Sequence, residues 1–152
     1  MRSSTEPPPE TPGAPQLAAA GPRAAAHRAE YEQLLGMILE GSRLHYAEPE
    51  GQRRDDPDLD LLVGDQLYAL GLSRLADLGD LEAVAELADL ISMLAAARAA
   101  GDEELAEAIW RAGAAAIGWG ATEAHEQAKA MARDGNPGAL DALLAGAERL
   151  RL

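Results

Sequence analysis

The sequence predicts an all-α fold, a compact antiparallel helical bundle that follows a disordered N-terminal tail. Apolar residues recur at three- and four-residue steps in several long segments, the spacing of one helix face. No segment shows the strict alternation of a half-buried strand. The segments are joined by short turns, which favour antiparallel neighbours. We therefore divide the chain into a tail, residues 1–22, and a helical domain, residues 23–152.

The first two segments are a proline-rich stretch and a helix. Residues 1–22 hold six prolines and show no helical period, a composition typical of disorder; a tail that binds a partner or directs targeting is the alternative. Residues 23–47 form the first predicted helix, in which Gly41 is a point of interruption or termination. A charged loop, residues 48–58, follows.

Aspartates and glycines mark the next two predicted helices. The second helix begins near Asp56, with Pro57 in its first turn, and runs to Leu78. The third covers residues 81–100, with Asp80 as its N-cap.

The C-terminal part of the chain predicts two more helices. Asp102 caps a long fourth helix that continues to about residue 132, with glycines inside it as points where it bends. A turn precedes the fifth helix, which starts at Asn136-Pro137 and ends near Arg149. The prediction is therefore five helices.

Composition and charge exclude several classes of function. The net charge is −13, from 26 acidic and 13 basic residues, which disfavours nucleic acids and anionic membranes as partners. The chain has no cysteine, so disulfides and thiolate chemistry are excluded. We expect neither a secretory signal nor a transmembrane segment, and a cytoplasmic protein is the expectation.

One acidic run matches the start of a calcium-binding loop but not the rest of that template. Asp56, Asp58 and Asp60 match positions 1, 3 and 5 of a calcium-binding loop. The template then requires glycine and glutamate where this chain has Leu61 and Leu67. The acids are better explained as favourable charge at a helix N-terminus.

No catalytic, metal-binding or cofactor-binding residue is predicted. The three histidines lie far apart in the sequence; His125, beside Glu123 and Glu126, is expected on an exposed helix face as part of a solvated charge cluster. No serine or threonine has a base and an orienting group nearby in sequence. Trp110 and Trp119 are expected to be core or interface anchors.

A resemblance to a known family comes from residues 59–120. The run "LLVGDQLYALGLSRLADLGD", followed by "LEAVAELADLISMLAAARAAG", resembles the trans-polyprenyl diphosphate synthases, in which a central helix opens with an apolar-Gly-Asp-apolar pattern. Gly64 and Asp65 match the centre of that pattern, and Tyr68 and "LADLGD" fit its continuation. The segment "AGDEELAEAIWRAGAAAIGWG" is similar to a later segment of the family. The resemblance is closest to the small non-catalytic subunit, component 1, of heptaprenyl diphosphate synthase.

The departures from this family bear on function. Catalytic members hold Mg²⁺ with two DDxxD motifs, whereas here Asp55-Asp56 is followed by Leu59 where the motif needs aspartate, and no second motif exists. The resemblance thus implies a truncated isoprenoid-synthase-like bundle. It implies an accessory subunit that stabilises a catalytic, DDxxD-bearing prenyl synthase subunit or sets product chain length, with Mg²⁺ bound by that partner. The alternative is a helical protein-protein interaction or assembly protein without an isoprenoid role, including one that self-associates.

The candidate interface lies in the same run. Gly64 and Gly71 are seven residues apart and share a helix face that admits close approach by another helix, either inside the domain or from a partner subunit. Asp65 lies in an apolar run, so we expect it to be buried and hydrogen-bonded. The candidate interface residues are Gly64, Asp65, Tyr68, Gly71, Leu72 and Leu75.

Overall fold

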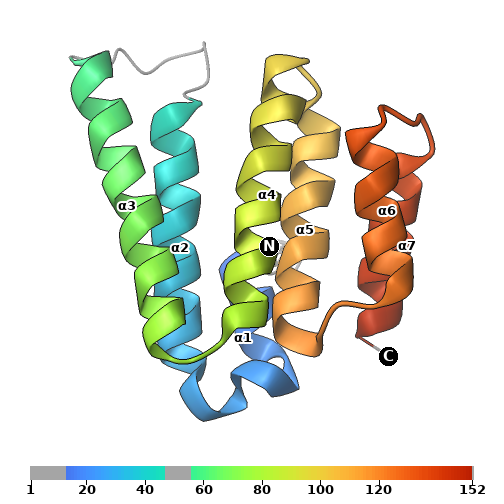
Figure 1. Cartoon of the computed structure of the whole chain (residues 1–152), viewed down its shortest axis with the longest axis horizontal. Coiled ribbons are helices and arrows are strands. Elements are labelled where there is room, and N and C mark those ends of the chain that lie inside the picture. Colours follow the sequence, from blue (N-terminus) through green and yellow to red (C-terminus); the bar gives the residue numbers. More distant parts are fainter. Residues whose placement is uncertain (1–12, 47–55, 152) are drawn as a thin grey trace, which may run out of the picture.

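The computed structural model describes residues 13–46 and 56–151, and these residues are helical without any strand. The all-α prediction is therefore confirmed. The described residues form seven α-helices (Figure 1) and one short 3-10 helix, η1. In chain order they are α1 Ala14–Ala20, η1 Pro22–His27, α2 Arg28–His45, α3 Pro57–Asp77, α4 Leu81–Ala99, α5 Glu103–Trp119, α6 Glu123–Arg133 and α7 Ala139–Leu150.

The long helices form three antiparallel hairpins that stand side by side (Figure 1). Each hairpin pairs two consecutive helices, α2 with α3, α4 with α5 and α6 with α7. α7 also packs against α5, and α1 packs against both α2 and α5. The short N-terminal helix therefore joins the first hairpin to the second.

Three aspartates cap the helices as the sequence predicts. The side chains of Asp56, Asp80 and Asp102 each accept a hydrogen bond, 3.1 Å long, from the backbone N–H three residues later. This bond satisfies one of the amides that a helix N-terminus leaves free. Gly79 and Gly101 have positive φ and end α3 and α4.

The prediction of one long fourth helix is wrong, because the chain breaks between α5 and α6. Gly120 has φ +99°, a conformation that residues with a side chain rarely adopt. Two residues later the Thr122 hydroxyl accepts a hydrogen bond from the His125 amide at 3.2 Å and caps α6. The glycine is therefore a terminator, and the threonine begins a new helix.

The prediction of a disordered tail is wrong for the part of the tail that the structure describes. Residues 14–20 form α1, which has Pro15 in its first turn and buries Leu17 and Ala18 in the core. A Cβ added at Gly21 would overlap the backbone of Gly118 in α5, so the chain packs closely there. Residues 1–12 lie outside the described residues. The first predicted helix also differs, since its start is η1 and Gly41 does not interrupt α2.

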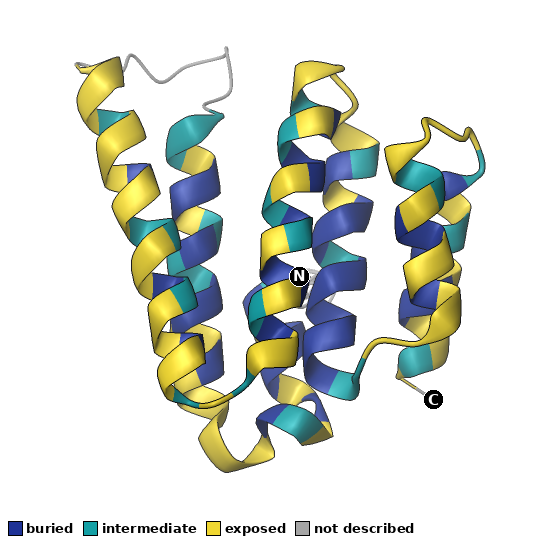
Figure 2. Cartoon of the chain, viewed as in Figure 1, coloured by how far each residue is buried: buried dark blue, intermediate teal, exposed yellow. Residues whose placement is uncertain are grey.

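Leucine and alanine build the core, as the low aromatic content requires. α5 is buried on nearly all sides, including an unbroken run from Ala112 to Gly118 (Figure 2). Trp110 and Trp119 both pack on this core. The largest fully buried apolar side chains are Leu34, Leu35, Ile38, Leu75, Leu87, Leu90, Leu94, Ile117 and Leu143. None of the helices that the structure describes combines the length and the apolar character needed to cross a membrane.

Candidate functional site

The glycines of the candidate interface lie where α3 crosses α2. Gly64, Gly71 and Leu75 are buried. A Cβ added at Gly71 would lie 2.6 Å from Cγ1 of Ile38, and one added at Gly64 would lie 2.5 Å from Cδ2 of His45. The close approach that these glycines permit is therefore made by a helix of the same chain.

Two further candidate residues lie on the same side of α3. Tyr68 and Leu72 are half-buried and pack against the core. The Tyr68 ring centroid lies 5.2 Å from that of His45 on α2. Burial is the main reason why the pKa of the Tyr68 hydroxyl is raised.

Asp65 does not occupy the buried position expected for it. Its side chain is 68% exposed, and Oδ1 lies 2.8 Å from Nε2 of His45. That distance is an ion-pair contact, but the ring N–H does not point at the carboxylate well enough for a hydrogen bond. Asp65 is on the flank of α3, where water solvates it, so its place in an apolar run does not bury it.

The side of α3 away from α2 exposes a row of large apolar side chains. Leu59, Leu62, Val63 and Leu70 are 55%, 60%, 37% and 45% exposed, respectively. Their spacing of three, one and seven residues places them on one helix face, which we call the α3 strip. In Figure 2 the outer side of α3 is coloured as exposed along most of its length. Five of the seven exposed large apolar side chains among the described residues lie on α3, the fifth being Leu61.

The α3 strip is not among the interface residues that the sequence predicts. The signal is present in the sequence, because the strip lies opposite the face that carries Gly64 and Gly71. A helix with apolar residues on both faces needs two partners to bury both of them. α2 covers one face, and the other is open in the part of the chain that the structure describes.

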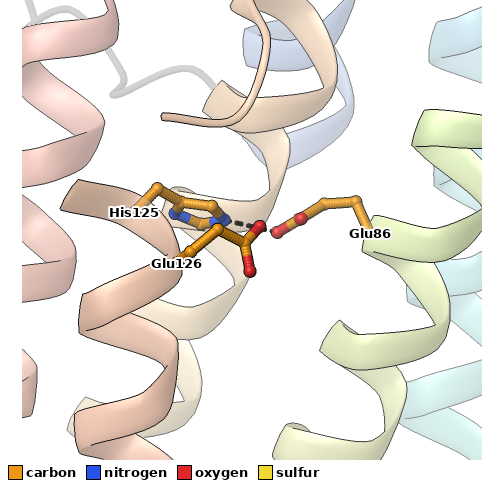
Figure 3. A group of neighbouring side chains, drawn as sticks. All are labelled: Glu86, His125 and Glu126. Carbon is orange, nitrogen blue, oxygen red and sulfur yellow. Dashed lines mark hydrogen bonds and ion pairs between the residues drawn. The ribbon is translucent and has the colours of Figure 1, made fainter. Parts of the chain in front are cut away.

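A second candidate site is a buried ionic network between α4 and α6. Nε2 of His125 lies 2.5 Å from Oε1 of Glu86 (Figure 3). Nζ of Lys129 donates to Oε2 of Glu86 at 2.9 Å. All three residues are at least nine-tenths buried. The expectation that His125 is solvated on an exposed face is therefore wrong.

Exposed charges complete the network at its edge. Lys129 Nζ also donates to Asp89 at 2.9 Å and lies 3.1 Å from Glu126, and Arg133 lies 3.2 Å from Asp89. Burial raises the pKa of the Glu86 carboxyl, but His125 and Lys129 outweigh that effect and the pKa is lowered. For Lys129 burial lowers the pKa, whereas its carboxylate partners raise it to about 12.

The same network contains a set of potential metal ligands. Glu86, His125 and Glu126 each place a ligand atom within 4.8 Å of the other two (Figure 3). The Lys129 ammonium already contacts both of these carboxylates, so it supplies the positive charge at this point. A hollow of about 310 Å³ beside the network is lined by paired charges, including Arg23 and Asp89. The arrangement fits an internally neutralised link between helices better than a metal centre.

A smaller polar cluster ties η1 to the start of α4. Arg23 donates to Oδ1 of Asp80 at 2.7 Å and to the Ile117 carbonyl at 2.8 Å, and the Tyr31 hydroxyl donates to Oδ2 of Asp80 at 2.5 Å. Burial and the bond to Asp80 raise the pKa of Tyr31 to about 12. Asp80 therefore both caps α4 and holds the N-terminal segment on it.

Comparison of the chain with protein-family models, curated proteins and solved structures finds no match.

Proposed function

We propose that this chain is a non-catalytic helical subunit that binds a catalytic trans-polyprenyl diphosphate synthase subunit through the α3 strip. In the complex it stabilises that subunit or sets the length of its product. The partner carries the DDxxD motifs and binds Mg²⁺, and the proposed compartment is the cytoplasm.

The observation that carries this proposal is the exposure of the α3 strip on a helix whose other face is already packed. Apolar surface removed from water stabilises by roughly 25 cal/mol per Å². Single exposed apolar residues are ordinary on protein surfaces, but a contiguous row of them on one helix marks an interaction site. The resemblance of residues 59–120 to the synthase family suggests which protein covers it.

Co-expression with a DDxxD-bearing synthase tests the proposal. The two chains should co-elute in gel filtration, and Leu62→Glu with Leu70→Glu should separate them, because a carboxylate placed in an apolar contact is desolvated without a partner. Leu81→Glu is the matched control, since Leu81 is 69% exposed and lies outside the α3 strip. The isolated variants should keep the thermal midpoint of the unsubstituted chain.

Two results would contradict the proposal. One is clean separation of the unsubstituted chain from the synthase. The other is a complex that tolerates both substitutions in the strip. Because the α3 strip does not depend on the resemblance, separation from the synthase together with strip-dependent binding of another helical protein would favour an interaction protein without an isoprenoid role.

A further inference from the structure

Acidic side chains border the α3 strip. At 3.6 residues per turn, Asp58 and Asp65 fall along one edge of the strip and Asp60 along the other. Asp77 lies at its C-terminal end, in line with Leu59 and Leu70. Asp58, Asp65 and Asp77 are exposed beside the strip, and Oδ1 of Asp65 also contacts His45 of α2.

The charge balance of this helix is strongly one-sided. Arg74 is the one basic residue in α3 and lies on the strip edge that carries Asp60, against four aspartates in the helix, and Asp56 adds a fifth acid at its N-cap. Complementary potentials across an interface determine which partners are accepted and how fast they associate. From this border we infer that the partner covers the α3 strip with a cationic amphipathic helix, an apolar stripe flanked by lysine or arginine. This inference rests on the proposed function and specifies the chemistry of its partner.

The dimensions of the strip fit one helix. Leu59 and Leu70 are 11 residues apart, or about 16 Å at 1.5 Å per residue. About three turns of a partner helix, with apolar residues at three- and four-residue steps, would cover that length.

A second copy of this chain is a poor fit to the same surface. Docking α3 on α3 would bring two helices with four aspartates and one arginine each into contact, and like charges at an interface cost free energy. An anionic membrane is repelled by the same border and by the net charge of −13. A cationic helix is the occupant that both the apolar row and its acidic edges accept.

The test uses the full chain and two fluorescent helical peptides of about 14 residues. Both carry leucine at three- and four-residue steps; lysines flank the leucines in one peptide and glutamates in the other. The lysine peptide should bind in an anisotropy titration, more weakly at high salt, and the glutamate peptide should bind at least about tenfold more weakly. The pair Asp58→Lys and Asp65→Lys should weaken binding of the lysine peptide by about tenfold. Circular dichroism of each variant checks that the helices are intact, and the neutral pair D58N and D65N should give a smaller loss in the same direction.

A matched control separates local charge from net charge. Glu107→Lys with Glu148→Lys changes the net charge by the same amount at exposed positions on α5 and α7, and it should leave binding of the lysine peptide within about twofold. Equal binding of the two peptides, or no binding of the lysine peptide, overturns the inference. Strip-dependent sedimentation with phosphatidylcholine vesicles containing phosphatidylserine also overturns it, because the occupant would then be a membrane. Failure of the proposed function is distinguishable, since the synthase would separate in gel filtration while the lysine peptide still binds.

Discussion

The helices of the α2–α3 hairpin and those of the α4–α7 half of the molecule are packed in different ways. In the second half, α5 is buried on nearly all sides and a buried ionic network links α4 to α6. In the hairpin, α3 packs on α2 through a glycine-lined crossing and, among the residues that the structure describes, exposes the α3 strip on its other side. The contrast shows that a helix with apolar residues on two faces can have one of them open to solvent within the described part of the chain.

The two contacts also differ in what holds them. The α2–α3 crossing depends on the absence of side chains at Gly64 and Gly71, which lets the helices approach closely. The α4–α6 contact depends on the buried Glu86 carboxylate, which the Lys129 ammonium and the His125 ring both contact. Removing a charge should therefore destabilise the α4–α7 half most. Adding a methyl group at a crossing glycine should destabilise the α2–α3 hairpin most.

The largest expected effect comes from Glu86→Ala. Without this carboxylate, His125 and Lys129 remain buried with their main partner gone, and breaking a buried ion pair costs about 3–5 kcal/mol. Urea denaturation followed by circular dichroism should show that loss in the free energy of unfolding. Replacing all three residues with apolar ones of similar volume should cost much less, because no buried charge is then left unpaired.

Glu82→Gln on the same helix is the control. The Glu82 side chain is 82% exposed and lies 3.1 Å from Arg23. An exposed ion pair contributes about 0–1 kcal/mol, so this variant should unfold close to the unsubstituted chain. If Glu86→Ala lowered the free energy of unfolding as little as Glu82→Gln, the α4–α6 network would be open to water.

The same network predicts how stability depends on pH. The pKa values of Glu86 and Asp89 are lowered in the folded chain, so their contribution is present above their unfolded values of about 4.5 and 3.8 and is lost as the pH falls through the lower folded values. The pKa of Lys129 is raised, so its contribution is present below 10.5 and is lost as the pH rises through about 12. The acid loss should be smaller than that of Glu86→Ala, because a protonated carboxyl can still form hydrogen bonds. Thermal midpoints measured from pH 7 to pH 3 check this. Over that range the midpoint of a Glu86→Gln chain should fall by less than that of the unsubstituted chain.

Local signals account for what the sequence predicts correctly. Asp56, Asp80 and Asp102 cap their helices through bonds to residues three positions away, and that spacing can be seen in the sequence. The end of α5 at Gly120 is not predicted, because a glycine in an apolar segment indicates a bend in a helix as readily as its end. Thr122 followed by Glu123 is the signal that a new helix begins there.

The candidate sites depend on contacts that a sequence does not display. His125 pairs with Glu86, 39 residues away, and a contact over that separation cannot be seen in the sequence. Its position three residues before the buried Ala128 is the available signal, since both lie on one face of α6. Asp65 is the opposite case, because it is expected to be buried and is exposed. An apolar run does not show which way each residue of a helix faces.

An intermediate effect is expected from Gly64→Ala. The added Cβ would lie 2.5 Å from Cδ2 of His45 and 3.0 Å from the Gly41 carbonyl oxygen, so the His45 ring must shift and α2 must move slightly away from α3. Overpacking of this kind costs about 1–3 kcal/mol. Hydrogen exchange should show faster exchange in α2 and α3 while α4 to α7 keep their protection.

Gly36→Ala is the matched control in α2. No atom lies within 4 Å of a Cβ added at Gly36, and replacing a helical glycine with alanine stabilises by up to about 1 kcal/mol. Loss of protection throughout the chain in Gly64→Ala would show that the hairpin and the α4–α7 half unfold as one unit.

The smallest effects are expected from Asp65→Leu and Asp77→Leu. Both carboxylates are exposed, and the contact of Asp65 with His45 is worth about 0–1 kcal/mol as a solvated pair. Asp77 lies in the last turn of α3, where a negative charge opposes the helix dipole, so its removal should stabilise by up to about 0.5 kcal/mol. The thermal midpoint of the isolated chain should therefore fall slightly for Asp65→Leu and hold or rise slightly for Asp77→Leu. A fall for Asp65→Leu as large as that for Gly64→Ala would place this carboxylate inside the α2–α3 contact, and the hairpin would then depend on charge as the other half does.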